Sequence, residues 1–376
     1  MRILFGGGGS GGHFYPIIAI AERIRDIIEE EKIVDAKLYY LAPEPYDEKA
    51  LFENGIAYRP ITAGKLRRYF SFRNAIDAVK TAVGVLRALW QVYLVFPDVV
   101  FGKGGWASFP TLLAARVLGI PVMVHESDSV PGRTNRWASK FARRIAISFE
   151  EAVSFFPAAK TAYTGQPIRK EILKPLKEGA HEYLKLDPTV PTILILGGSQ
   201  GAELVNDAVF RALPELLSAY QVIHQVGPKN LENAEKLASV ILKESPHAGR
   251  YRAFGYLNDL SMRMAAGISS LIVSRAGSTL FEIAAWGIPS ILIPITDSNG
   301  DHQRKNAFNY ARAGACVVVE EANLTPHVLI SQIAKLMENE AGRAKMAEAA
   351  QKFHRPDAAK VIAKELIALA LEHEPR

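Results

Sequence analysis

Short apolar runs recur along the chain, and several of them end in a glycine-rich turn that leads into a segment of helical periodicity. The first run covers residues 3–5, and apolar positions repeat at helical spacing from 17 to 30, with Pro16 placed in the first helical turn. Further strands are expected at 36–42, 56–61, 99–101, 121–125 and 144–149. This alternation of strands and helices predicts a doubly wound parallel α/β sheet.

The second half of the chain repeats the same pattern. Strands are expected at 192–196, 220–225, 251–256, 270–274, 290–295 and 315–319, and the tail from 325 to 374 is helical with a break near 354–356. We therefore predict two Rossmann-like domains that face a cleft, one over 1–162 and one over 163–356. The last helix, 357–376, is long enough to pack back on the first domain.

Three glycine turns, at 6–13, 102–110 and 197–202, each follow an apolar strand and open a helix. Glycine permits positive φ and a close approach of the backbone to a ligand, and the N–H groups of a helix start attract anions such as phosphate. Ligands collect at the carboxyl ends of parallel strands, where all three turns lie. His13 stands beside the first turn, where a histidine suits proton transfer near neutral pH. The alternative is a plain βα turn capped by His13.

The first turn also matches the dinucleotide fingerprint at Gly7, Gly9 and Gly12. A hydride-transfer enzyme would place an acidic residue roughly 20 positions further on, at the end of the second strand. The first candidate, Glu44, comes later than that. The match therefore does not favour a dehydrogenase.

Composition narrows the class of partner. The chain has 376 residues and a net charge of +6, which favours an anionic partner such as a nucleotide or a phospholipid surface. Its single cysteine, Cys316, lies in an apolar run and fits a reducing compartment. The basic residues are not gathered in a recognised nucleic-acid motif, so we expect no nucleic-acid partner.

We expect no signal peptide and no membrane span, because the best apolar stretch, 82–96, is short and carries Arg87 and Gln91. Cations and aromatic residues interleave shortly before it, which suits an anionic membrane interface. These residues are Lys65, Arg67, Arg68, Phe70, Phe72 and Arg73. The alternative is a solvated loop whose aromatic side chains fold back into the core. The expected location is the cytoplasmic face of the cell membrane, as a peripheral protein.

Several motifs taken together resemble one family. Residues 6–16, 102–110 and 197–202 are similar to the three glycine loops of the MurG-type transferases, which belong to glycosyltransferase family 28 and have the GT-B fold. Residues 125–132, 164–169, 275–282 and 301–306 resemble further motifs of that family, in the same order, over nearly the whole chain. The resemblance implies inverting transfer of GlcNAc from UDP-GlcNAc to the muramoyl 4-hydroxyl of lipid I, giving lipid II, without a metal or a cofactor.

The resemblance also implies roles for single residues. His13 matches the proposed general base, Glu282 the carboxylate that binds the ribose hydroxyls, Leu257 a residue whose backbone reads uracil, and Gln303 an amide that recognises the sugar. The full set of expected substrate-binding residues is Ser10, Gly11, Gly12, Asp128, Arg169, Ser199, Leu257, Thr279, Glu282 and Gln303. Gly9, Gly104 and Gly105 are expected at the acceptor diphosphate.

The sequence departs from the family pattern at a few positions. Asp128 stands where asparagine is usual, Gln166 where asparagine often precedes the proline, and Ser10 where threonine is common. Residues 275–282 are one residue shorter than the usual form, so 276–278 are not aligned. Two other enzyme classes stay open: another GT-B transferase with a lipid or secondary-metabolite acceptor, and a UDP-GlcNAc 2-epimerase. A non-catalytic nucleotide-sugar binder is disfavoured by the intact His13 and glycine loops.

Overall fold

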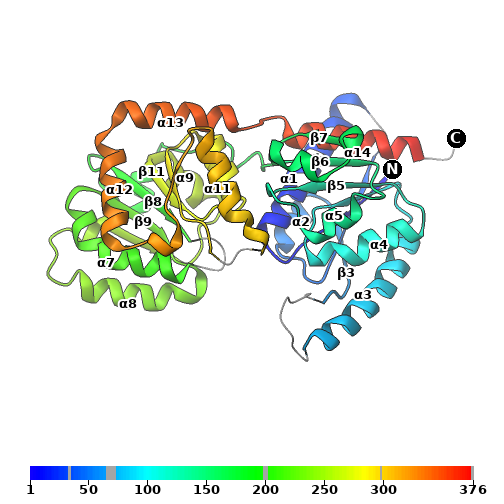
Figure 1. The fold of residues 1–376 in the computed structure, drawn as a ribbon, viewed down its shortest axis with the longest axis horizontal. Helices are drawn as coiled ribbons and strands as arrows, with labels where there is room; N and C mark the ends of the chain where they lie inside the picture. The colour runs from blue at the N-terminus through cyan, green and yellow to red at the C-terminus, as the bar shows by residue number, and fades with distance from the viewer. Residues whose placement is uncertain (33–34, 65–72, 198–201, 297–298, 374–376) are drawn as a thin grey trace. The chain divides into compact units, whose positions relative to one another are not determined.

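The computed structural model describes residues 1–32, 35–64, 73–197, 202–296 and 299–373. The chain divides into two compact units, Met1–Arg169 with Arg355–Arg376, and Lys170–His354. The boundary lies a few residues later than the sequence indicates, because residues 161–163 add a last strand to the first sheet. Each unit is an α/β layer structure built on one parallel sheet, as the hydrophobic pattern predicts (Figure 1).

The first unit contains a seven-stranded sheet in the order β3-β2-β1-β4-β5-β6-β7. Its strands are β1 (Arg2–Gly6), β2 (Lys37–Ala42), β3 (Ile56–Pro60), β4 (Val99–Gly102), β5 (Val122–Glu126), β6 (Arg144–Ile147) and β7 (Thr161–Tyr163). Its helices are α1 (Gly11–Glu31), α2 (Glu48–Glu53), α3 (Arg73–Val95), α4 (Phe109–Val117), α5 (Arg133–Ala138) and α14 (Ala358–His373). The helices cover both faces of the sheet: α1 and α14 pack in one core, and α3 and α4 pack in the other (Figure 1).

The second unit contains a six-stranded parallel sheet in the order β10-β9-β8-β11-β12-β13. Its strands are β8 (Thr192–Leu196), β9 (Gln221–Gln225), β10 (Tyr251–Phe254), β11 (Ser269–Ser274), β12 (Ser290–Leu292) and β13 (Val317–Val318). Its helices are α6 (Ala180–Leu184), α7 (Glu203–Ala219), α8 (Leu231–Ile241), α9 (Asp259–Ile268), α10 (Thr279–Trp286), α11 (His302–Arg312), α12 (Pro326–Glu338) and α13 (Glu340–Phe353). Buried runs such as β8 are typical of parallel sheets covered on both faces.

Strand register places the glycine turns side by side. In the first sheet Gly6 at the end of β1 pairs with Gly102 at the end of β4, so the turns after both strands start at the same level. In the second sheet Leu196 pairs with Ser274 on one side and with Gln225 on the other. The segments that follow β8, β9 and β11 therefore also begin together, at the carboxyl edge of their sheet.

The start of α1 differs from the prediction. The helix begins at Gly11, so Pro16 lies in its second turn and not in its first. Proline has no N–H, so it cannot donate to the carbonyl of Gly12 as a residue at this position normally would. The helix continues through Pro16 without this hydrogen bond. Its early start places His13 in the first helical turn, beside the glycine loop.

The terminal helix α14 belongs to the core of the first unit. Ile362, Ala363 and Leu366 are fully buried, and they pack with β1 and α1 residues such as Ile3 and Ile20. An apolar face of this size contributes substantially to stability, since each buried leucine side chain contributes roughly 2 kcal/mol. None of the described helices is long and apolar enough to cross a membrane.

Shortening a buried leucine of α14 tests this packing. We expect Leu366→Ala to lower the free energy of unfolding of the first unit by roughly 3 kcal/mol, because Leu366 is 0% exposed. Leu371→Ala is the matched control, since Leu371 on the same helix is 47% exposed, and its effect should stay within about 0.5 kcal/mol. Urea unfolding followed by tryptophan fluorescence measures both. Equal effects of the two substitutions would contradict the packing described here.

Candidate active site

The first glycine loop connects β1 to α1 and carries His13. Gly8 and Gly9 have φ of 112° and 83°, which side-chain-bearing residues rarely adopt, and a Cβ at Gly8 would lie 2.8 Å from the hydroxyl of Tyr40. The backbone N–H of His13 donates to the carbonyl of Ser10, and Ser10 Oγ lies 2.8 Å from His13 Nδ1. One imidazole nitrogen is therefore held by the loop that precedes the helix, which fixes the ring.

The second glycine loop approaches the same imidazole. Gly104 and Gly105 have φ of 87° and 75°, and a Cβ at Gly105 would lie 3.3 Å from His13 Nε2. A Cβ at Gly9 would lie 3.2 Å from the indole nitrogen of Trp106, which belongs to the second loop. The structure thus brings together Gly9, Ser10, Gly11, Gly12, His13, Gly104 and Gly105, which the sequence assigns to one site.

A buried polar chain lies beneath these loops. Lys103 is 2% exposed, and its Nζ donates to Ser127 Oγ, which in turn donates to Gln166 Oε1 over 2.9 Å. Ser148 Oγ donates to the same Gln166 oxygen at 3.0 Å. The second glycine loop, the segment after β5 and the turn at 164–169 are therefore joined through side chains.

Glu126 organises the neighbouring segment. Its carboxylate accepts from the backbone N–H groups of Asp128 and Gly132, each at 3.0 Å, and from Asn135 Nδ2 at 2.9 Å. Burial and the nearby Asp128 raise the pKa of Glu126. A Cβ at Gly104 would lie 2.7 Å from Asn135 Nδ2, so the same asparagine packs against the second glycine loop. Asp128 itself is half-buried at the carboxyl end of β5.

Arg169 lies against the start of α1. Its guanidinium carbon is 3.7 Å from the ring centroid of Tyr15, two residues after His13. Stacking on an aromatic face restricts the orientation of the guanidinium. The structure thus places Arg169 with the first-unit site residues, and the ring of Tyr15 supports it.

The remaining predicted residues follow the strands of the second sheet. Leu257 comes after β10, Thr279 begins α10 and Glu282 lies in its first turn, and Gln303 lies at the start of α11. Gln225 at the end of β9 joins the Leu257 segment to Gly197, the first residue after β8. The carbonyl of Gln225 accepts from the Gly197 N–H at 3.2 Å, and its side-chain oxygen accepts from the Leu257 N–H at 3.0 Å. Ser199 lies outside the described residues.

Several residues of the site were not predicted from the sequence. Lys103, Tyr15 and Gln225 have structural roles here that become visible only once the strands are aligned. Lys103 carried one signal, since a charged residue in a turn of glycines directly after a buried strand is unusual. Within the part of the chain that the structure describes, no group of three His, Cys, Asp or Glu side chains could hold a metal ion.

Two units, each built on one parallel α/β sheet, with the two glycine turns of the first unit at the carboxyl edge of its sheet, are typical of the GT-B class of proteins. Family models agree with this class: the glycosyltransferase family 28 N-terminal domain matches residues 3–147, and the family 28 C-terminal domain matches residues 192–362. Among solved structures, Acinetobacter baumannii MurG aligns with a TM-score of 0.71 and 26% identity, covering 98% of this chain and 99% of that chain.

Curated relatives are similar over almost the whole length. A UDP-N-acetylglucosamine–N-acetylmuramyl-(pentapeptide) pyrophosphoryl-undecaprenol N-acetylglucosamine transferase from Bacillus cereus is 37% identical over 342 residues, which is 90% of this chain and 92% of the relative. The Treponema denticola transferase of the same name is 34% identical, over 93% of this chain and 92% of the relative. The chain belongs to glycosyltransferase family 28, among the MurG-type transferases.

A likeness to a different class of enzyme is confined to the fold. The UDP-GlcNAc 2-epimerase from Neisseria meningitidis bound to UDP-GlcNAc aligns with a TM-score of 0.67 at 16% identity, over 98% of this chain and all of that chain. Identity at this level shows a shared fold and no shared chemistry.

The buried lysine predicts a specific pH dependence of stability. Burial lowers the pKa of Lys103 to about 8 from its ordinary 10.5, although Glu126 and Asp128 raise it. Between pH 8 and pH 10 the unfolded chain binds more protons at this residue than the folded chain, so the stability of the folded state rises with pH. Relative to Lys103→Met, the wild type should gain about 2 kcal/mol in free energy of unfolding across that window.

Denaturant unfolding at several pH values measures this gain. Lys140→Met is the matched control, because Lys140 is an exposed lysine of the same unit. The free energy of unfolding of the wild type minus that of Lys140→Met should not change with pH. If the corresponding difference for Lys103→Met also did not change with pH, Lys103 would not be buried as the structure shows.

Proposed function

We propose that the protein transfers GlcNAc from UDP-GlcNAc to the muramoyl 4-hydroxyl of lipid I, with inversion at the anomeric carbon, to give lipid II. The single observation that carries the proposal is the similarity of 34% to 37%, over at least 90% of this chain, to transferases named for this reaction. The arrangement of His13 between the first two glycine loops supports it, because a glycosyl transfer to a hydroxyl needs a base beside an anion-binding site.

His13 is proposed as the general base. When Nδ1 carries the hydrogen and donates to Ser10 Oγ, Nε2 is the basic nitrogen, and it is the nitrogen that faces Gly105. Nε2 then takes the proton of the acceptor hydroxyl as the hydroxyl oxygen attacks the anomeric carbon. The bond from that carbon to the diphosphate breaks, and UDP leaves with the negative charge.

The acceptor diphosphate is proposed to lie on the backbone of Gly9, Gly104 and Gly105. Glycines at these positions leave the backbone N–H groups open to close approach, which side chains would prevent. Asp128 and the half-buried loop residues Ser10, Gly11 and Gly12 are assigned to the donor sugar. An ionised Asp128 accepts hydrogen bonds and donates none, so it would bind a sugar hydroxyl as an acceptor.

The donor nucleotide is proposed to bind along the carboxyl edge of the second sheet. Because the Leu257 N–H already donates to Gln225 Oε1, uracil would be read through the Leu257 carbonyl, which accepts from a base N–H. Glu282 in the first turn of α10 accepts from the ribose hydroxyls, with Thr279 one turn before it. Ser199 and Arg169 are assigned to the diphosphate and the sugar, and the fork of a guanidinium matches phosphate oxygens.

The membrane-facing surface is proposed to include one face of α3. Val79, Val83, Leu86, Trp90 and Tyr93 recur at helical spacing and are between 40% and 68% exposed. The opposite side of the helix packs so tightly that a Cβ at Gly84 would lie 1.7 Å from the carbonyl oxygen of Thr62.

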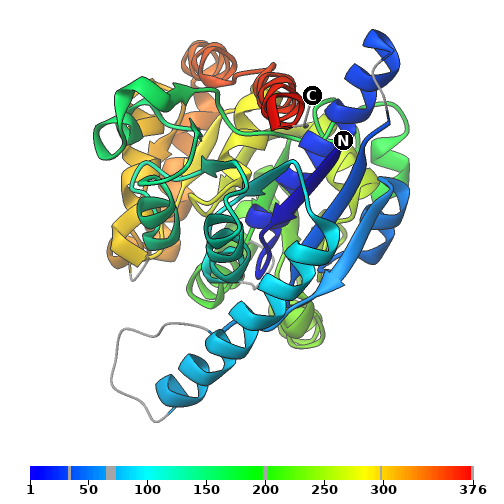
Figure 2. The same ribbon diagram turned by 90° about the vertical axis from the view of Figure 1, so that its right-hand side faces the viewer.

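The surroundings of this face favour an anionic lipid surface. Lys80 and Arg87 are exposed on the same helix, and the amino-terminal end of α3 extends away from the rest of its unit (Figure 2). Such a combination of apolar and cationic side chains suits the headgroup region of a membrane. The predicted contacts Lys65, Arg67, Arg68, Phe70 and Phe72 lie outside the described residues, as does the side chain of Arg73.

Removing the proposed base tests the reaction. We expect His13→Ala to lower kcat for transfer of labelled GlcNAc to a lipid I analogue by about 100-fold to 10,000-fold, with the Kd for UDP-GlcNAc changed less than about threefold. His327→Ala, an exposed histidine of α12, is the control and should keep full activity. Transfer by His13→Ala at a rate close to that of the wild type would remove the base assignment.

The proposed membrane face is tested with vesicles. We expect Leu86→Ser combined with Trp90→Ser to weaken binding to vesicles of anionic phospholipid by roughly tenfold, because both side chains are more than half exposed and apolar. Leu237→Ser with Val240→Ser on α8 is the matched control, since these side chains are 42% and 73% exposed. Co-sedimentation measures both pairs. Equal binding by the two double variants would argue against α3 as the contact.

A further inference from the structure

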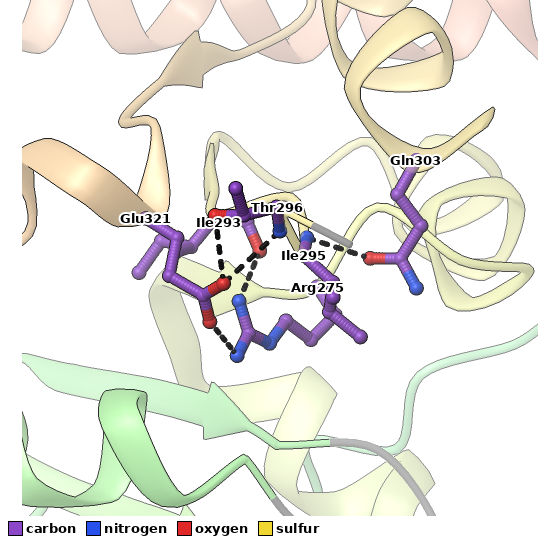
Figure 3. Close-up of polar contacts among 6 residues, drawn as sticks. All are labelled: Arg275, Ile293, Ile295, Thr296, Gln303 and Glu321. Carbon is purple, nitrogen blue, oxygen red and sulfur yellow. Dashed lines mark hydrogen bonds and ion pairs between the residues drawn. The ribbon is translucent and has the colours of Figure 1, made fainter. Parts of the chain in front are cut away.

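One buried carboxylate in the second unit holds together three segments at the carboxyl edge of its sheet. Glu321 follows β13, and its Oε1 accepts from Arg275 Nη2 at 2.5 Å (Figure 3). Its Oε2 accepts from both the backbone N–H and the hydroxyl of Thr296, each at 3.0 Å. The Glu321 and Arg275 side chains are 9% and 11% exposed, so this ion pair is shielded from solvent.

The same arginine reaches the segment that Glu321 holds. Arg275 Nη1 donates to the carbonyl of Ile293 at 3.0 Å, just after β12. Ile293 is therefore tied through the arginine and Thr296 through the carboxylate. Between these two anchors lies Ile295, so its backbone N–H has a fixed direction (Figure 3).

That N–H sets the orientation of the Gln303 amide. The Ile295 N–H donates to Gln303 Oε1 at 3.2 Å (Figure 3). Because the amide oxygen is engaged on this side, the amide NH₂ points to the other side (Figure 3). Glu321 and Gln303 do not touch, but the carboxylate holds the backbone that aligns the amide.

The electrostatics of the pair agree with a geometric role. Burial raises the pKa of Glu321, but the hydrogen bonds from Thr296 and Arg275 outweigh it, so the pKa lies below its ordinary value and the carboxylate stays ionised. Buried ion pairs contribute little net stability, because the desolvation of both charges offsets their attraction. What such a pair provides is a defined position for the groups that it binds.

We propose that Glu321 is a positioning residue for sugar recognition: by holding Thr296 and Arg275 it aligns Gln303, whose amide NH₂ then donates to oxygen atoms of the donor sugar. This inference rests on the proposed function, because it takes UDP-GlcNAc as the ligand of the second unit. Glu321 does not touch the substrate in this proposal. It affects recognition of the sugar and not recognition of UDP.

Binding of UDP and of UDP-GlcNAc to the full chain, measured by calorimetry, tests the proposal. In Glu321→Gln the side chain has one acceptor oxygen for two partners, so the Ile295 segment loses an anchor. We expect the Kd for UDP-GlcNAc to rise about tenfold, the effect of one lost hydrogen bond, while the Kd for UDP stays within about twofold. The KM for UDP-GlcNAc should rise with little change in kcat.

The neighbouring glutamate supplies a matched control. Glu320 bonds to the Nε of Arg304 at 2.5 Å in a partly exposed ion pair, and Arg304 directly follows Gln303 in α11. Glu320→Gln makes the same chemical change one residue away and should leave both Kd values unchanged. Thr296→Val removes only the hydroxyl bond to Glu321 and should give a smaller rise in the Kd for UDP-GlcNAc, without the loss of a buried charge.

A double-mutant cycle with Gln303→Ala completes the test. If Glu321 acts through Gln303, Glu321→Gln should have no further effect on the Kd for UDP-GlcNAc in the Gln303→Ala background. Additive effects, or an equal loss of UDP affinity in Glu321→Gln, would overturn the positioning role while leaving the proposed function intact. A wild-type protein that binds no UDP-GlcNAc would overturn the proposed function and this inference with it.

Discussion

The parallel pairing of Gly6 with Gly102 is the constraint on which the first unit's site depends. Because the two strands end at the same level, the loops after them meet, and both can expose backbone N–H groups only where side chains are absent. Glycines with φ between 75° and 112° supply that opening. The imidazole of His13 fits between the loops, with one nitrogen on Ser10 and the other facing Gly105. A site made of backbone suits recognition of a diphosphate by shape and dipole, and we propose that His13 is the side chain that transfers the proton.

Buried polar groups give this open backbone a rigid support. In the first unit the chain from Lys103 through Ser127 to Gln166 joins the second glycine loop to the turn that leads to Arg169. In the second unit Gln225 joins the start of the third glycine loop to Leu257, and Glu321 joins Arg275 to Thr296. The two sheets therefore use the same principle, in which strand ends set the position and buried side chains fix it.

Much of the fold and part of the site could be predicted from the sequence. The parallel sheets follow from apolar runs such as 192–196, and the glycine turns follow from their composition, because both signals are local in the chain. The early start of α1 was missed, since Pro16 read as a first-turn residue while the glycines before it gave no helical periodicity. Lys103, Gln225 and Glu321 were missed because their partners are far away in sequence and meet only through strand register. The roles of His13 and Glu282 came from resemblance to a family, and they remain predictions.

The account's central claim is that the protein uses UDP-GlcNAc to glycosylate a lipid-linked acceptor. The most direct measurement incubates the wild-type protein with UDP-GlcNAc labelled in the sugar and a lipid I analogue, and then separates the lipid from the nucleotide fraction. The account predicts that label moves to the lipid in step with the release of UDP, and that it stays on UDP when the acceptor is omitted. Label that remained on the nucleotide as an epimerised sugar, or that never reached the lipid, would contradict it.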